Sequence, residues 1–100
     1  MKFMLSFDID PDFRDQAIAR FRAGGGLPPA GATLLGRWTR LDFSGGFDLL
    51  ETDDPACLLG FALEWSDLMH IEIVPVADDA LLGAVLAARE APKGKGKRGK

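Results

Sequence analysis

The chain has 100 residues, which is enough for one domain and too few for two. Hydrophobic residues make up 47% and charged residues 27%, a globular composition that excludes a collagen-like, coiled-coil or disordered body. Residues 1–92 carry seven Lys and Arg against fifteen Asp and Glu, a net charge of −8, whereas residues 93–100 carry five bases and no acid. The acidic body repels phosphates, so we expect no specific nucleic-acid binding.

The cysteine content and the length of the apolar segments bear on the cellular location of the protein. Cys57 is the single cysteine and cannot form an intrachain disulfide, and no apolar run approaches the roughly 20 residues that span a bilayer. The apolar stretch after Met1-Lys2 is too short for a signal peptide. We therefore expect a cytoplasmic protein without membrane association, with one domain over residues 1–90 and a basic, disordered tail over residues 91–100.

The first third of the chain predicts a strand and a helix. Residues 2–9 alternate Phe3, Leu5 and Phe7 with more polar positions, which is typical of a strand with one apolar face. Asp10-Pro11 then favours a helix start, because Asp accepts hydrogen bonds from free amides and Pro suits the first helical position. A helix follows to about residue 22, and the glycines at 24–26 end it.

The remainder predicts a hairpin, a helix, a strand and a last helix. The pattern predicts two antiparallel strands, at residues 34–39 and 47–52, joined by a turn at Ser44-Gly45-Gly46. After Asp53-Asp54-Pro55, a second helix carries an apolar stripe made of Leu58, Leu59, Ala62, Trp65 and Leu68-Met69. Residues 70–76 form an edge strand. Asp78-Asp79 starts a third helix that ends near residues 90–92, with its large apolar side chains inward: Leu81, Leu82, Val85 and Leu86.

The order βαββαβ with a C-terminal helix predicts an α+β, ferredoxin-like sandwich whose helices cover one face of the sheet. We call the other face the open face. With Phe3, Leu5 and Phe7 toward the helices, the open face is predicted to hold Met4, Ser6, Leu35, Arg37, Asp48, Leu50, Glu72 and Val74. That mixture is too apolar for exposure, so we expect a homodimer in which two open faces stack around a cavity.

Several short segments together resemble one family. They are Met1-Lys2-Phe3-Met4, the stretch from Ala19-Arg20-Phe21 to Gly31, Leu35-Gly36-Arg37-Trp38, Gly45-Gly46-Phe47 and Trp65-Ser66-Asp67-Leu68. Over residues 1 to about 88 they resemble the bacterial domain-of-unknown-function family numbered 3303, in the dimeric α+β barrel group. The resemblance implies the fold and the dimer. It carries over no catalytic residue, since Thr39 stands where the family often has a His.

Arg37-Trp38 is the leading candidate for ligand contact. A guanidinium holds an anion in a bidentate fork and an indole offers a stacking surface. Consecutive strand residues point to opposite faces, so one of the two lines a cavity, and Arg37 can instead pair with Asp48 across the hairpin. The full set of candidate ligand-binding residues is Ser6, Arg37, Trp38, Asp48 and Glu72.

Other reactive residue types have structural explanations. His70 lacks the partners of a metal site and suits an exposed position at the start of a strand. Cys57 lacks a neighbouring base and suits core packing, and the paired aspartates suit helix caps. The glycines at 24–26 follow a helix, so they suit a turn and not a phosphate loop. We therefore expect no metal and no cofactor.

The function that fits best is binding of a small, partly apolar or anionic ligand in a cavity at the open face of a dimer. One alternative is a cofactor-independent enzyme of the monooxygenase or isomerase type, for which Asp48, Glu72 and His70 are the candidate proton acceptors. A second alternative is a structural dimerisation module. No catalytic residue follows from the sequence.

Overall fold

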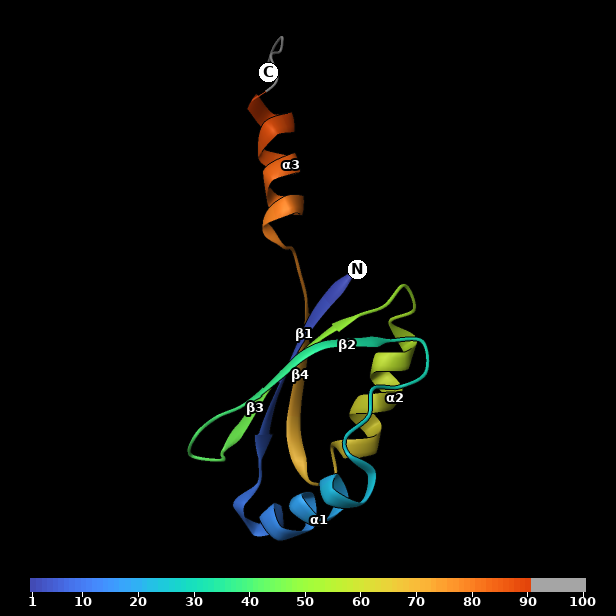
Figure 1. Cartoon of the computed structure of the whole chain (residues 1–100), viewed down its shortest axis with the longest axis vertical. Coiled ribbons are helices and arrows are strands. Elements are labelled where there is room, and N and C mark those ends of the chain that lie inside the picture. Colours follow the sequence, from blue (N-terminus) through green and yellow to red (C-terminus); the bar gives the residue numbers. More distant parts are fainter. Residues whose placement is uncertain (91–100) are drawn as a thin grey trace.

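The computed structural model describes residues 1–90, and the predicted tail at residues 91–100 lies outside them. The described residues form four strands, a short 3₁₀ turn and three helices (Figure 1). In chain order the elements are β1 (Lys2–Ile9), η1 (Pro11–Phe13), α1 (Arg14–Gly24), β2 (Thr33–Thr39), β3 (Gly45–Glu51), α2 (Ala56–Trp65), β4 (Met69–Val76) and α3 (Asp79–Glu90).

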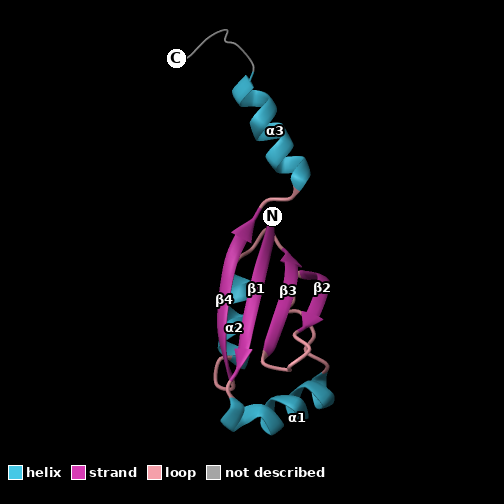
Figure 2. Cartoon of the chain, turned by 90° about the vertical axis from the view of Figure 1, so that its left-hand side faces the viewer, coloured by secondary structure: helices cyan, strands magenta, loops and turns pink. Residues whose placement is uncertain are grey.

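The four strands form one antiparallel sheet in the order β2-β3-β1-β4. This is the strand order of a ferredoxin-like fold, so the predicted α+β class is confirmed. Figure 2 shows α2 behind the sheet and α1 below its lower end. The face on the α2 side is therefore covered by α2, and the opposite side is the open face. The prediction that the helices cover one face holds for α2, whereas α1 lies at the lower end of the sheet.

Acidic side chains begin the helical segments, as their position before proline or an apolar run predicts. Asp10 Oδ1 accepts from the backbone N–H of Asp12 at 2.9 Å, directly before η1 and α1. Asp54 Oδ1 accepts from the N–H of Ala56 at 3.2 Å at the start of α2. Each bond satisfies an amide that a helix start leaves without an intrahelical acceptor.

The glycines of the β2–β3 hairpin lie in a strand, which corrects the predicted turn at Ser44-Gly45-Gly46. Gly45 and Gly46 belong to β3, and the chain reverses over residues 41–44. A Cβ on Gly45 would collide with the carbonyl oxygen of Phe7, and one on Gly46 with that of Trp38. The missing side chains thus allow the close approach of β1 and β2 to β3, a use of glycine that a local pattern does not distinguish from a turn.

The core lies between the sheet and α2. Leu5 and Leu50 from the sheet and Leu58 and Phe61 from α2 form one buried cluster. Cys57 is half-buried and packs against this cluster, which confirms its predicted packing role. The predicted stripe of α2 is confirmed at Leu58 but wrong at Leu59, which is 64% exposed, and Phe61 is buried in its place. The positions of Leu58 and Leu59 differ by about 100° around the helix, so the sequence pattern alone did not fix the centre of the buried face.

α3 does not pack against the body, which contradicts the predicted inward position of its large apolar side chains. Every residue of α3 is exposed. Figure 1 shows the helix continuing beyond the end of the sheet at which β1 begins and β4 ends. The helical periodicity was a correct guide to the element but does not specify what covers its apolar face.

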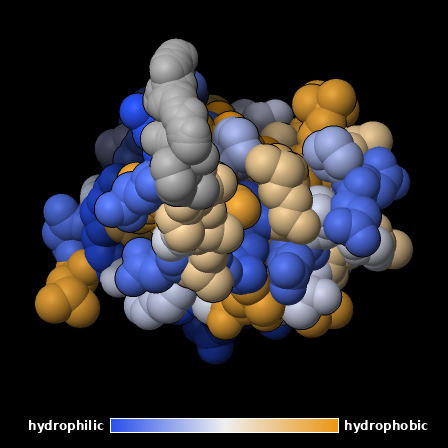
Figure 3. All heavy atoms as spheres, turned by 90° about the horizontal axis from the view of Figure 1, so that it is seen from above, coloured by the Kyte–Doolittle hydropathy of each residue, from blue (hydrophilic) through white to orange (hydrophobic). Residues whose placement is uncertain are grey.

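The surface mixes polar and apolar side chains. Seen from above, hydrophobic residues lie beside hydrophilic ones around α3 (Figure 3). On the open face, Trp38 is 55% exposed. No helix within residues 1–90 has both the length and the hydropathy needed to cross a bilayer.

Candidate functional site

The strand register places Arg37 and Asp48 on the helix side of the sheet. Asp48 lies opposite both Leu5 of β1 and Arg37 of β2, and directly opposed residues of antiparallel strands share a face. Leu5 belongs to the buried core, so the two charged residues lie on that side too. Leu50, opposite Phe3, is fully buried there. The prediction that Arg37, Asp48 and Leu50 lie on the open face was wrong.

This prediction failed because it assumed which face of the β2–β3 hairpin lies on the same side of the sheet as Phe3, Leu5 and Phe7 of β1. Alternation within one strand separates its two faces but does not say which face of the hairpin joins which face of β1. A register shift between Leu34 and Gly36 additionally interrupts the alternation of β2 at Leu35. The face of Arg37 was therefore set by pairing with β3 and not by the pattern around it.

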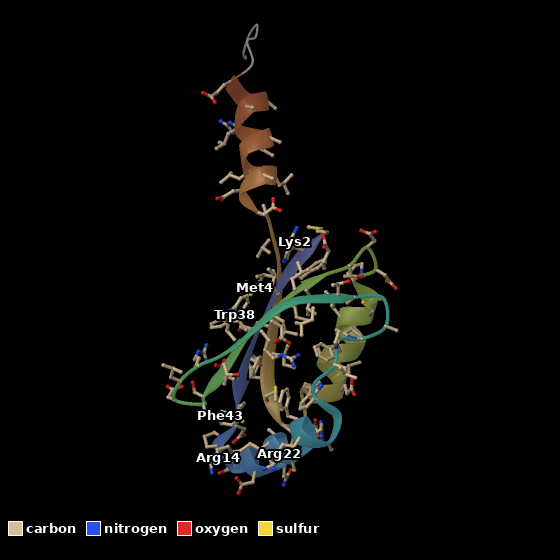
Figure 4. All side chains as sticks on the ribbon, in the orientation of Figure 1. Lys2, Met4, Arg14, Arg22, Trp38 and Phe43 are labelled. Carbon is tan, nitrogen blue, oxygen red and sulfur yellow. The ribbon has the colours of Figure 1, made fainter. Side chains whose placement is uncertain are left out.

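The other candidate residues lie on the open face. Ser6 is opposite Glu72, and Trp38 is opposite Phe47. Met4 and Trp38 point to the side of the sheet away from α2 (Figure 4). The five candidate residues therefore do not form one site. They are divided by the sheet, with Arg37 and Asp48 on one side and Ser6, Trp38 and Glu72 on the other.

A cavity of about 400 Å³ lies on the helix side, between the sheet, α1 and α2. We expected a cavity at the open face. This cavity lies on the opposite side, because its wall includes Leu5 of β1, Ala17 of α1 and Phe61 of α2. We call it the interior cavity. Its wall is mostly aromatic and aliphatic and is made by Leu5, Phe7, Ile9, Ala17, Ile18, Phe21, Phe43, Phe61, Trp65, Met69 and Ile71, together with Arg14, Gly26, Arg37, Thr39 and Asp48.

Arg37 and Asp48 form the main charged feature of this wall. Arg37 donates from Nε to Asp48 Oδ1 at 2.7 Å and from Nη2 to Oδ2 at 3.0 Å, which is a bidentate ion pair. The side chain of Asp48 is 3% exposed and that of Arg37 is 21% exposed. A carboxylate buried to this extent requires the compensation that the guanidinium supplies.

Arg37 also fixes the segment that follows α1. Its Nη2 donates to the carbonyl oxygen of Gly26 at 2.7 Å, and its Cζ lies 5.7 Å from the ring centroid of Phe21. Gly26 has φ +60°, and a Cβ there would lie 2.8 Å from Nη1 and 2.9 Å from the Phe21 ring. The glycine run was predicted to be a turn. Its contact with the candidate arginine had no signal in the sequence.

A second arginine ties α1 to the end of α2. Arg20 donates from Nη1 and Nη2 to the two carboxylate oxygens of Asp67 at 2.8 and 2.7 Å, and also to the carbonyl oxygen of Glu64 at 2.8 Å. Its Cζ lies 5.3 Å from the ring centroid of Trp65. The hydrogen bond from Arg20 lowers the pKa of Asp67 below its usual 3.8. Arg20 and Arg37 together hold α1 beside the interior cavity.

The predicted proton acceptors are not assembled in one place. Asp48 lies on the helix side with both oxygens bonded to Arg37, whereas Glu72 and His70 lie on the open face. His70 Nε2 and Glu72 Oε2 are 3.2 Å apart, and His70 is exposed, as its position in the sequence predicted. The part of the chain that the structure describes contains no group of three metal-ligating side chains. Of the three residues named for the enzyme alternative, His70 and Glu72 thus lie together, and the sheet separates Asp48 from them.

The fold and the cavity define a class: a small α+β protein with ferredoxin-like strand order and an apolar cavity that holds one buried ion pair. The family model described as a domain of unknown function, DUF3303, matches residues 1–90. The chain belongs to this family, which confirms the family resemblance that the sequence motifs indicated. Searches of curated proteins and of solved structures gave no match.

Proposed function

We propose that this protein binds a small, mainly apolar molecule with one anionic group in the interior cavity, with Arg37 as its polar contact. The observation that carries the proposal is the cavity of about 400 Å³ lined by apolar side chains around the Arg37–Asp48 pair. Ligand sites typically enclose roughly 300–1,000 Å³ and combine apolar walls with a few polar groups.

The size of the cavity supports a binding role. Two side chains of its wall, Phe21 and Phe43, are 47% and 38% exposed, so the cavity opens to solvent and a small molecule can enter it. Here α1 lies apart from the sheet and buries only Ala17, while Ile18 and Phe21 line the cavity from the same helix. A molecule between these side chains and Leu5 or Phe7 of β1 would restore the packing that the helix alone does not supply.

The donors of Arg37 support the anionic group. A guanidinium carries five N–H groups, and three of them bond to Asp48 and Gly26 through Nε and Nη2. Among residues 1–90 the structure gives Nη1 no acceptor. A carboxylate, sulfonate or phosphate oxygen is the strongest acceptor for these two remaining donors.

The test uses 8-anilinonaphthalene-1-sulfonate, an apolar aromatic dye with one anionic group. We expect saturable binding with one site per chain and a blue-shifted emission. Ala17→Leu fills the cavity from α1 and should weaken binding by about tenfold or more. Ala19→Leu is the matched control because Ala19 is exposed on the same helix, and it should leave binding unchanged. Equal binding by the two variants would overturn the proposal.

The role of Arg37 is separated from the role of the cavity with a second dye. N-phenyl-1-naphthylamine has a similar aromatic body and no sulfonate. The double variant Arg37→Gln/Asp48→Asn replaces the ion pair with two neutral amide side chains, so that neither charge is left unpaired. It should weaken binding of the sulfonate dye by about tenfold and leave the neutral dye unaffected. Equal losses for both dyes would remove Arg37 as the anion contact.

We also propose that the protein is a homodimer whose interface includes the open face. A row of apolar residues crosses this face at one level of the register, where Leu49, Met4 and Val74 lie side by side. Trp38 and Phe47 form the neighbouring pair and are both exposed. A contiguous apolar surface of this kind supports association with another protein surface.

The mass in solution tests the homodimer. At micromolar concentration, light scattering should give twice the chain mass of 10.8 kDa. Trp38→Lys should shift the mass toward one chain. Leu59→Lys is the control, because Leu59 is 64% exposed on α2, away from the open face, and it should keep the dimer. A single-chain mass for the unmodified protein would contradict this proposal.

A further inference from the structure

We propose that α3 is an exchanged arm: in the homodimer, α3 of each copy packs its apolar side chains on the open face of the other copy. This inference rests on the proposed homodimer and specifies what covers the open face. It concerns two surfaces that the described chain leaves without a partner, the apolar stripe of α3 and the apolar row of the sheet.

The apolar stripe of α3 consists of Leu81, Leu82, Val85 and Leu86. These side chains lie on one side of the helix, because residues four apart are neighbours on a helical surface. They are 48–53% exposed, and every other residue of the helix is exposed as well. Residues 91–100 contain no large apolar side chain.

The start of α3 is tied to the end of the sheet, and this tie directs the helix away from its own body. Asp78 Oδ1 accepts from the N–H of Leu81 at 2.9 Å and caps the helix, while its Oδ2 accepts from Lys2 Nζ at 3.2 Å. Lys2 also lies 3.7 Å from Glu51 of β3. Figure 4 shows Lys2 at the point where the chain passes from the sheet into α3. The body of the same chain therefore does not reach the stripe.

The open face matches the stripe in chemistry and in size. Its apolar row, Leu49, Met4 and Val74, spans three of the four strands, and Trp38 and Phe47 widen it on the β2 side. Twelve helical residues measure about 18 Å along the axis, and four strands measure about 19 Å across. One α3 helix is thus long enough to cross the whole sheet.

A second copy of this chain is the occupant that satisfies both surfaces at once. Each copy offers one arm and one open face, so a two-fold axis gives both arms and both open faces a partner. Direct stacking of two open faces would cover the sheets and leave both arms exposed.

The test is a complementation experiment with full-length chains. The arm variant carries Leu82→Glu and Leu86→Glu, and the face variant carries Trp38→Lys and Val74→Lys. Each variant alone should give the mass of one chain. In the arm variant an acidic arm would meet an apolar open face, and in the face variant an apolar arm would meet a basic open face. Mixed in equal amounts they should recover the dimer mass, since one native arm–face contact is restored and the other becomes a Glu–Lys contact.

The matched control for the arm is Ala80→Glu/Ala87→Glu, which places the same charges on the side of α3 opposite the stripe and should remain dimeric. Circular dichroism of every variant verifies that the fold is retained. A dimeric arm variant beside a monomeric face variant would overturn the exchange and keep the homodimer, with the sheets stacked directly. A monomeric arm variant beside a dimeric face variant, or a mixture that stays monomeric, would also overturn the exchange. A monomeric unmodified protein would overturn both proposals.

Discussion

Arg37 and Asp48 face each other across the β2–β3 pair and are joined by two hydrogen bonds, of 2.7 and 3.0 Å, on the helix side of the sheet. Because the carboxylate is almost completely buried, the pair is both a structural requirement and the polar feature of the interior cavity. Its geometry also joins the hairpin to α1, since the same guanidinium bonds to Gly26.

Removing one member of this pair should destabilise the protein strongly. Asp48→Ala leaves a partly buried guanidinium without its counter-ion, and we expect the free energy of unfolding to fall by about 3 kcal/mol. The double variant Arg37→Met/Asp48→Leu leaves no unpaired charge and should recover most of that loss. Urea unfolding followed by circular dichroism measures both. A loss below about 1 kcal/mol for Asp48→Ala would show that the pair is dispensable.

Gly26 should tolerate no side chain. Gly26→Ala places a Cβ at φ +60° and within 2.8 Å of Arg37 Nη1, so we expect a loss of about 1–3 kcal/mol in unfolding free energy. Gly24→Ala is the control: nothing lies within 4 Å of its Cβ, and alanine favours the helix, so stability should stay equal or rise by up to about 1 kcal/mol. Thermal unfolding of the two variants shows whether glycine is required at position 26 specifically or at every position of the run 24–26.

The Arg20–Asp67 pair should make stability depend on pH in the acid range. The pKa of Asp67 is below its usual 3.8 because Arg20 hydrogen-bonds to the ionised form. A depressed pKa in the folded state contributes stability that is present above pH 3.8 and is lost as the pH falls through the folded value. Asp67→Asn should therefore be less stable than the unmodified protein at pH 7, and the difference should shrink toward pH 2. Urea unfolding at several pH values measures the difference; a gap that does not change with pH would contradict the assignment.

Asp78 should hold the first turn of α3. Its pKa is lowered chiefly by the backbone N–H of Leu81 and also by Lys2, so the cap is present at neutral pH and is lost as the pH falls below the usual 3.8. Asp78→Ala should accelerate amide hydrogen exchange in α3 at pH 7 and leave β1 and β4 unchanged. Asp79→Ala is the comparison, because the Leu81 N–H bonds to Asp78 and not to Asp79. Equal exchange rates in the two variants would contradict the capping role.

The local elements of this protein were predictable because their signals are local. Alternation in residues 2–9 predicted β1, and Asp10-Pro11 predicted the helical segment that follows it. The same reasoning placed Cys57 against the core and His70 at an exposed position. The strand and the helix start depend on residues only a few positions apart in the chain. The burial of Cys57 and the exposure of His70 follow from the polarity of each side chain.

The sequence by itself determined the order of strands and helices, their caps and the family, because these depend on neighbouring residues and on motifs read along the chain. Only the tertiary structure decided the face on which Arg37 and Asp48 lie, the cavity beside α1 and the exposure of the α3 stripe. These features depend on the register between strands distant in sequence and on where a helix docks. An alternating strand fits either face equally well, and an amphipathic helix shows that its apolar side needs a partner without showing which surface supplies it.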